Sequence, residues 1–271
     1  MAIITISRGT FSGGKALAER VAERLGYPCL SRKDAVEDAA KEYDITPEDL
    51  TAALNEGAPL WEQIPGKRVA YLKCVAATIL KHAEQGNLVY HGHAGHLLLR
   101  GVSHLLRVRV VADKEFRIKA AMERKNLNRE GAMAHIEKID RDRQKWSSFL
   151  YGINWEDPSL YDAVLNLERL SIESACETII RMATLDEFKM TAEAQKALKD
   201  VTLGSKVWAA LAKNDLTRKA GAKVSAQGGL VTIEGTAGSQ KIVDAISEMA
   251  RKVEGVKEIR NEVGVGTDWY W

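Results

Sequence analysis

The residues that could do chemistry begin with a glycine-rich segment near the amino terminus. Residues 9–15 (GTFSGGK) satisfy the spacing GxxxxGK. In such a loop the glycines let successive backbone N–H groups face one anion at the positive end of the following helix. Lys15 adds a mobile charge for the terminal phosphates of a nucleotide. The segment predicts a phosphate-binding loop; the alternative is an ordinary strand-to-helix turn whose lysine is merely exposed.

The residue after the lysine departs from this pattern. A serine or threonine that binds Mg²⁺ usually stands there, but this chain has Ala16, followed by Leu17. Mg²⁺ would then be held by substrate phosphates, waters and a carboxylate elsewhere, which its octahedral coordination tolerates. We expect ATP and Mg²⁺ to bind here. The residues expected to contact ATP in the loop are Gly9, Ser12, Gly13, Gly14, Lys15 and Ala16.

The elements that must position this loop follow from periodicity. Residues 3–7 are β-branched and apolar and predict a buried strand, whereas apolar residues from position 17 recur at helical spacing until Gly26. Further strands are expected at 88–91, 105–111 and 163–167, and helices at 67–83, 114–125 and 172–183. Alternating strands and helices predict an α/β fold, a parallel sheet with helices on both faces. Ligands of such folds bind at the carboxyl ends of the strands.

A second, smaller core is expected towards the carboxyl terminus. After a polar stretch near 184–195, the pattern gives a helix, a hairpin around QGG, a second helix and a last strand. This αββαβ order predicts an independent α+β domain. The expected divisions are a first domain at 1–185, a linker at 186–195, a second domain at 196–267 and an aromatic tail at 268–271.

Composition narrows the class of protein. Of 271 residues 45% are apolar, and the three cysteines form no CxxC pair, which argues against a disulfide framework and a zinc site. The chain runs from Met1 into an apolar strand and has no apolar run of transmembrane length, so we expect a cytoplasmic protein. Residues 196–262 hold twelve basic and eight acidic side chains. This mild excess indicates anionic partners or merely a solvated lysine-rich face, and no specific nucleic-acid site.

Five segments of the chain resemble the cytidylate-kinase-like family, relatives of the nucleoside-monophosphate kinases. They are SRGTFSGGKALAERVAERLGYPCLSRKD, LVYHGHAGHLLL, RVRVVADKEFRIKAAMERK, KIDRDR and WEDPSLYDAVLNLERLSIESA, and they span about residues 1–183. The resemblance implies ATP-dependent phosphoryl transfer to a nucleoside monophosphate, CMP- or dCMP-like, or to a similar small acceptor.

The resemblance also implies roles for single residues. Lys15 would hold the donor phosphates and Arg117 would stack on the adenine. Arg141 and Arg143, beside Asp140, would close over the transferring group, so that Lys15, Arg141 and Arg143 form the expected catalytic set. Positions Arg32 and Asp162 would contact the acceptor. The alternatives are that Arg117 is a solvent-facing charge, that residues 140–143 form a self-paired exposed helix face, and that Asp162 braces the following strand.

A turn rich in histidine follows the strand at 88–91. Relatives usually have an arginine where this chain has His93, within the turn 92–95, and an imidazole lacks the bidentate fork of arginine. We expect His93 to contact the acceptor; structural packing is the alternative. His91 and His96 raise the question of a metal site, but the third histidine lies beyond a glycine turn and no carboxylate joins them. No metal-ligating residue is therefore predicted.

The carboxyl-terminal segment resembles a BON domain. The resemblance is carried by GGLVTIEGTAGSQ, EMARKVEGVKEIRNEVGV and the helix at 207–215. It implies a small module that binds phospholipid, a membrane surface or another small ligand. The tail Trp269-Tyr270-Trp271 is either an aromatic anchor or a segment docked on the module's own sheet. Two rival functions stay open: a catalytically weak nucleotide-binding regulator that signals through its BON domain, and a kinase for a non-nucleotide acceptor.

Overall fold

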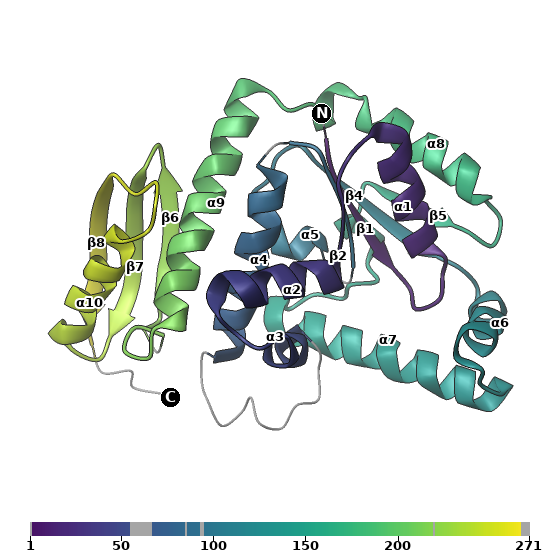
Figure 1. Ribbon diagram of the computed structural model, residues 1–271, viewed down its shortest axis with the longest axis horizontal. Helices are drawn as coiled ribbons and strands as arrows, with labels where there is room; N and C mark the ends of the chain where they lie inside the picture. Colours follow the sequence, from purple (N-terminus) through teal and green to yellow (C-terminus); the bar gives the residue numbers. More distant parts are fainter. Residues whose placement is uncertain (1, 55–66, 85, 93–94, 219, 267–271) are drawn as a thin grey trace. The chain divides into compact units, whose positions relative to one another are not determined.

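The computed structural model describes residues 2–54, 67–84, 86–92, 95–218 and 220–266 (Figure 1). The chain divides into two compact units. The first draws its described residues from Met1–Asp34 and Gln85–Thr191, and the second from Ala35–Leu54, Ala58–Glu84 and Ala192–Trp271.

The first unit is built on a five-stranded sheet. Its strand order is β2-β3-β1-β4-β5, and every neighbouring pair is parallel. The strands are β1 (Ile3–Arg8), β2 (Cys29–Ser31), β3 (Leu88–His91), β4 (Leu105–Val111) and β5 (Ala163–Asn166). The predicted parallel sheet is confirmed, and β2 is the one strand of this sheet that periodicity did not indicate, because three residues are too few to show a period.

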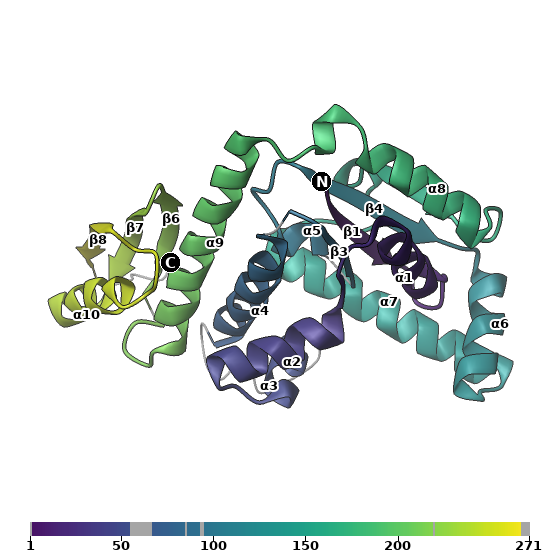
Figure 2. The same cartoon turned by 45° about the horizontal axis from the view of Figure 1, so that its top comes forward.

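Helices cover both faces of this sheet (Figures 1 and 2). Alternate residues of β1 point to opposite faces. Ile4 and Ile6 share a buried apolar cluster with residues of α1 (Gly14–Leu25) and α8 (Ile172–Ala183). On the other face, α5 (Gly95–Leu98) contacts β1, and its His96 lies against Ser7. The predicted fold class, a P-loop-type α/β sheet with helices on both sides, is confirmed.

Two further helices of the first unit form a pair beside the sheet. They are α6 (Lys114–Lys125) and α7 (Arg129–Tyr151), which pack through Ile118 and Ile136. Each begins at a side-chain cap: Asp113 accepts a hydrogen bond from the Phe116 N–H, and Asn128 accepts one from the Gly131 N–H. Short 3₁₀ turns follow at Pro158–Leu160 and Asp186–Phe188. The caps fix where both helices start.

The second unit holds the predicted αββαβ module. Its helices are α9 (Ala192–Lys213) and α10 (Gln240–Arg251), and its strands are β6 (Lys223–Gln227), β7 (Leu230–Ala237) and β8 (Glu258–Val265). The strand order is β6-β7-β8, with β6 antiparallel and β8 parallel to β7. Gly228 and Gly229 both have positive φ angles at the hairpin turn, where a side chain would be strained.

Three helices from the middle of the sequence belong to the second unit. They are α2 (Arg32–Tyr43), whose first residues belong to the first unit, α3 (Pro47–Leu54) and α4 (Lys67–Ala83). Cys74 and Ala77 of α4 form one buried cluster with Ala209 of α9. The small side chains let the two helices approach closely. The boundaries drawn along the sequence stay predictions, and α9 begins at Ala192, inside the stretch assigned to a linker.

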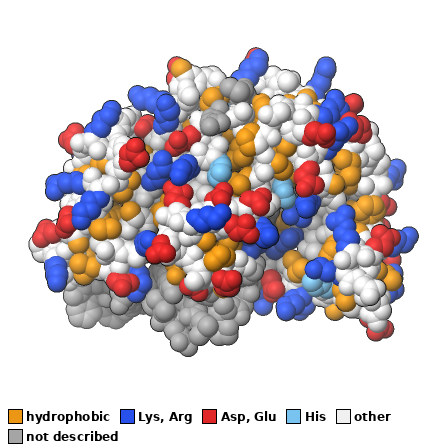
Figure 3. All heavy atoms as spheres, in the orientation of Figure 1, with side chains coloured by type: hydrophobic (Ala, Val, Ile, Leu, Met, Phe, Trp, Pro, Cys, Tyr) orange, Lys and Arg blue, Asp and Glu red, His pale blue; other side chains and the backbone are white. Residues whose placement is uncertain are grey.

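The distribution of surface charge and the apolar character of the helices indicate which kinds of partner the chain could bind. On the face shown in Figure 3, acidic and basic side chains are interspersed, so positive charge is not gathered into one stripe there. Among the described helices, none combines the length and the apolar character needed to cross a membrane.

Candidate active site

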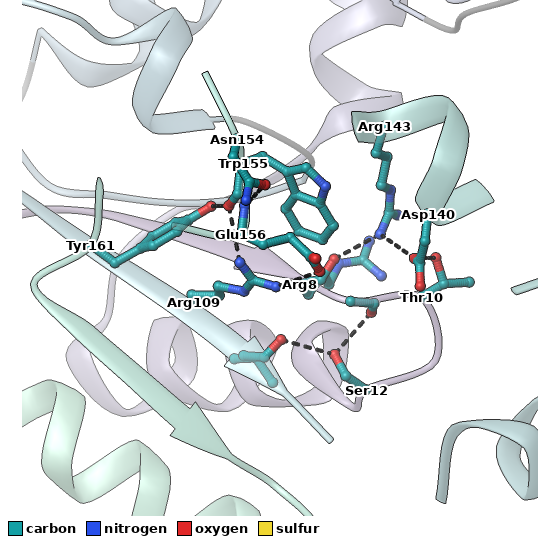
Figure 4. Close-up of polar contacts among 12 residues, drawn as sticks. Arg8, Thr10, Ser12, Arg109, Asp140, Arg143, Asn154, Trp155, Glu156 and Tyr161 are labelled. Carbon is teal, nitrogen blue, oxygen red and sulfur yellow. Dashed lines mark hydrogen bonds and ion pairs between the residues drawn. The ribbon is translucent and has the colours of Figure 1, made fainter. Parts of the chain in front are cut away.

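The glycine-rich loop joins the carboxyl end of β1 to the start of α1. The Ser12 hydroxyl shares its one proton between the carbonyl oxygens of Gly9, at 2.9 Å, and Val110, at 3.3 Å, so it braces the loop from within (Figure 4). Gly13 has a φ of 85°, a left-handed conformation that suits glycine. The loop thus presents the N-terminus of α1, and the first turn of that helix contains no acidic residue to oppose an anion.

The last glycine of the loop makes room for an arginine. A Cβ atom at Gly14 would lie 2.7 Å from Cβ and 2.9 Å from Cδ of Arg8, the last residue of β1. The Arg8 side chain can therefore run across the start of α1 only because residue 14 has no side chain.

Lys15 stands in the first turn of α1 and is exposed. Its side chain is 61% exposed, and its Nζ lies 3.6 Å from Oε1 of Glu19, one turn along the helix. A surface pair of this kind is weak, so the ammonium group can reorient towards a phosphate. Ala16 follows it and offers no side-chain oxygen to a metal ion.

An ion pair ties α6 and α7 to the loop. The Arg117 guanidinium donates through Nε to the Thr10 carbonyl oxygen at 2.7 Å and forms an ion pair with the Asp140 carboxylate. The Thr10 hydroxyl donates to the same carboxylate at 3.1 Å (Figure 4). The Arg117 side chain is only 16% exposed. The alternative that Arg117 is a solvent-facing charge is therefore wrong.

Arg143 reaches the end of β1 from α7. Its Nη1 donates to the Arg8 carbonyl oxygen at 2.8 Å, and its guanidinium carbon lies 5.9 Å from the centre of the Trp155 ring. Burial lowers the pKa of Arg143 to about 10, Asp140 acts in the opposite direction, and the nearby Arg8, Arg32 and Arg117 lower it further. Four guanidinium groups thus gather around the loop, with Asp140 among them.

Arg141 lies on another side of α7. Residues two positions apart in an α-helix are rotated by roughly 200° about the helix axis, so the side chains of Arg141 and Arg143 point in different directions. Arg141 lines an open cleft of about 460 Å³ between α6 and α7, whose other lining residues are Lys114, Arg117, Ile136, Glu137 and Asp140. Asp140 and Arg143 turn inwards, so the alternative of a self-paired exposed helix face at 140–143 is also wrong.

The carboxyl end of β3 supplies the other side of the site. His91 Nδ1 lies 3.4 Å from Nη2 of Arg8, and burial, followed by the charge of Arg8, lowers the pKa of His91 to about 4. This imidazole is therefore neutral near pH 7. Burial also lowers the pKa of Arg32, at the start of α2. His93, expected to contact the acceptor, lies outside the described residues, as does the aromatic tail.

The model of the cytidylate kinase-like family matches residues 3–169, which is more than half of the chain. The chain belongs to the cytidylate kinase-like family. A BON domain matches residues 199–267, in agreement with the resemblance of the αββαβ module.

Curated relatives share the kinase part of the chain. A cytidylate kinase from Staphylothermus marinus is 28% identical over 182 residues, covering 66% of this chain and 94% of the relative. One from Pyrobaculum calidifontis is 26% identical over 172 residues, covering 64% and 87%. A solved structure of an uncharacterized protein from Eubacterium ventriosum has a TM-score of 0.53 at 22% identity, covering 67% of this chain and 98% of its own. This last likeness concerns the fold alone.

Several residues predicted from the sequence to bind ATP or to act in catalysis lie close together. The loop residues, Arg117 and Arg143 surround the carboxyl end of β1, and Arg141 lines the adjoining cleft. Their individual roles stay predictions. Asp162 lies elsewhere: both of its carboxylate oxygens accept hydrogen bonds from Arg107, at 2.6 Å to Nη2 and 2.8 Å to the backbone N–H. This favours the alternative in which Asp162 braces β4 against β5.

His96 has a structural environment. It is buried, its Nδ1 lies 3.3 Å from the Ser7 hydroxyl, and its ring meets Tyr161 edge-on at 4.7 Å. Burial lowers its pKa to about 4. Within the described parts of the chain, no three His, Cys, Asp or Glu side chains are grouped closely enough to hold a metal ion.

Two arginines of the site were not singled out from the sequence. Arg8 ends β1 directly before the loop, and Arg109 is buried in β4, where it donates to the Trp155 carbonyl oxygen and to Glu156, each at 3.0 Å (Figure 4). Both stand within strands made mostly of apolar residues. A charged residue at such a position was the available signal, because burying an arginine costs free energy unless it has a partner or a ligand.

Proposed function

We propose that this protein is an ATP-dependent kinase that transfers a phosphoryl group to a nucleoside monophosphate or a similar small anionic acceptor. The observation that carries the proposal is the gathering of Arg8, Arg32, Arg117 and Arg143 around a glycine-rich loop at a helix N-terminus. Phosphoryl transfer needs positioning and neutralisation of spreading negative charge, with little covalent chemistry from the protein.

The roles of the residues follow from their places. Loop amides and Lys15 would hold the donor phosphates, and the cleft beside Arg117 and Arg141 would take the adenine. Arg143 is held close to the loop and would neutralise the transferring group.

The chain fits Mg²⁺ bound mainly through phosphate oxygens and water. Ala16 offers no ligand, and Asp140 is a carboxylate already bonded to the loop through the Thr10 hydroxyl. When bound, Mg²⁺ would neutralise phosphate charge and fix its geometry.

The test of this function is ADP release measured with a panel of nucleoside monophosphates and small phosphorylated acceptors. Lys15→Ala should lower turnover by orders of magnitude. Lys252→Ala is the matched control, because Lys252 also forms an exposed pair one helical turn from a glutamate. Nucleotide affinity and turnover that survive Lys15→Ala would remove the loop from the site.

For the acceptor, we propose weak activity on CMP or a preference for another acceptor. His93 stands where relatives have an arginine able to grip a phosphate with two hydrogen bonds. His93→Arg should raise CMP phosphorylation if this turn faces the acceptor. CMP turnover by the unchanged protein that matches a dedicated cytidylate kinase would contradict the proposal.

A second candidate is a catalytically weak nucleotide-binding regulator that signals through the BON domain. Two observations favour it: Ala16 replaces the metal-binding hydroxyl, and the BON helix α9 packs on α4 through Ala209. The BON ligand would be a phospholipid or another small ligand. Tight ATP binding without ADP release on the whole acceptor panel would favour this candidate over the first.

A further inference from the structure

Arg8 is a partly buried arginine without an acidic partner among the described residues. Among the described residues, none offers a carboxylate within ion-pair distance of it, and its Nε is buried with no hydrogen-bond partner. Its only side-chain hydrogen-bonding neighbour in the described chain is Nδ1 of His91, at 3.4 Å. Because His91 is neutral near pH 7, it does not balance the charge of Arg8.

Tyr90 adds a second buried group without a partner. The side chain is 1% exposed, and its hydroxyl has no hydrogen-bond partner among the described residues. A Cβ atom at Gly92 would lie 2.8 Å from this hydroxyl and 3.1 Å from Cβ of Arg32, so Gly92 lies directly against it. Buried polar groups in folded proteins almost always have a partner, and two neighbouring exceptions require an explanation.

Positive charge predominates at this place, although Glu19 acts against it on Arg8 and Asp140 acts against it on Arg143. Burial lowers the pKa of Arg8, and Arg32 lowers it further by repulsion. Burial raises the pKa of Tyr90 to about 12, against the opposing effect of Arg32 and Arg8, so the phenol keeps its proton and can donate it in a hydrogen bond. Arg143 donates to the backbone of Arg8 and adds a third cation. Such a group of donors is complementary to an anion with several oxygens.

We propose that Arg8 and the Tyr90 hydroxyl form the subsite for the anionic group of the acceptor, with a phosphate monoester as its ligand. The inference rests on the proposed kinase function and names a subsite within it. A guanidinium can engage two phosphate oxygens at once, so Arg8 would supply the grip that His93 cannot. Because Arg8 ends β1 beside the loop, the acceptor phosphate would be held next to the donor phosphates.

The first experiment measures binding without turnover. Inorganic phosphate is titrated into the full chain saturated with ADP, and thermal stabilisation gives its affinity. Arg8→Met and Tyr90→Phe should weaken phosphate binding, by at least about tenfold for Arg8→Met, because each removes a donor to a charged ligand. Neither substitution should weaken ADP binding by more than about twofold, because neither removes a hydrogen bond expected to reach ADP. Arg24→Met is the control, since Arg24 forms only exposed ion pairs.

Stability separates a ligand-binding role from a structural one. An arginine that is partly buried without an acidic partner destabilises the ligand-free protein, so Arg8→Met should melt at the same or a higher temperature than the unchanged protein. A structural arginine would give a lower melting temperature. If Arg8→Met fails to fold, Tyr90→Phe and Arg8→Lys carry the test, and Arg8→Lys should keep part of the phosphate affinity because it keeps the charge.

The outcomes are distinguishable from those of the function proposed above. Unchanged phosphate affinity in both Arg8→Met and Tyr90→Phe would overturn the subsite, as would an equal loss of ADP and phosphate binding in Arg8→Met. If no acceptor is phosphorylated, yet phosphate binding depends on Arg8 and Tyr90, the subsite stands and the kinase proposal fails. In an active enzyme, Tyr90→Phe should raise KM for the acceptor and leave KM for ATP unchanged.

Discussion

Asp140 is the carboxylate placed among the arginines of the site, and its replacement by asparagine gives a quantitative prediction. The change keeps the shape of the side chain and an oxygen that can accept from the Thr10 hydroxyl. It removes the charge that pairs with Arg117 and that lies 4.0 Å from Arg143. The variant should therefore be less stable, and it should depend more on bound anions.

The magnitude follows from burial. The side chains of Arg117 and Asp140 are 16% and 27% exposed, so the pair lies between a surface pair and a buried one. Exposed pairs contribute about 0–1 kcal/mol, whereas breaking a buried pair costs about 3–5 kcal/mol. We expect Asp140→Asn to lower the free energy of unfolding by about 2 kcal/mol, between these limits. Phosphate at ten times its Kd should restore about 1.4 kcal/mol.

The assay is urea unfolding at low ionic strength, followed by tryptophan fluorescence, with and without phosphate. Trp146 and Trp155 are buried in the first unit and report on its unfolding. Asp186→Asn is the control: Asp186 forms a surface pair with Lys189, and its loss should leave the midpoint unchanged. An Asp140→Asn midpoint equal to that of the unchanged protein would refute the reasoning. So would a phosphate effect that, at the same phosphate concentration, is no larger than in the unchanged protein.

Three further predictions concern Arg141 and Arg143, the pH dependence of stability, and the BON module. Arg143→Ala should lower kcat more than it raises KM. The sequence predicts the same for Arg141→Ala, and a rise in KM for ATP with kcat unchanged would instead show that Arg141 only lines the cleft. Burial lowers the pKa of His96 from 6.5 to about 4, so as the pH falls the unfolded chain takes up a proton at this residue before the folded chain does. The contribution of neutral His96 to the free energy of unfolding should therefore be complete above pH 6.5 and decrease towards pH 4. His96→Asn should reduce this decrease, measured as urea midpoints across the same pH range. A fragment of residues 190–271 should fold around its own apolar cluster, and any binding to anionic liposomes should be released by salt in co-sedimentation; a fragment that stays in the supernatant under every condition would exclude membrane binding.

The sequence by itself determined the elements and the phosphate loop. The helices predicted at 67–83, 114–125 and 172–183 begin and end in the structure at those residues, because apolar side chains recur along one helix face. Asp113 and Ser171 also cap the starts of the second and third of these helices. The parallel sheet followed from the alternation of strands and helices. The loop was visible because all of its groups lie within seven consecutive residues.

Only the tertiary structure decided which distant residues of the site contact one another. Thr10 meets Asp140 and Arg8 meets Arg143 across 130 and 135 residues of chain, distances over which periodicity carries no information. The sequence showed Asp140, Arg141 and Arg143 as one charged run, whereas the turn of α7 sends Arg141 to the cleft and Arg143 to the end of β1. Asp140 lies between them, lining the cleft and accepting a hydrogen bond from the loop. Likewise, the contact of Ala209 with α4 depends on how distant helices pack, since small residues mark a close approach but do not name the partner. Local patterns fix local structure, and a site built from several strands and helices exists only once the chain has folded.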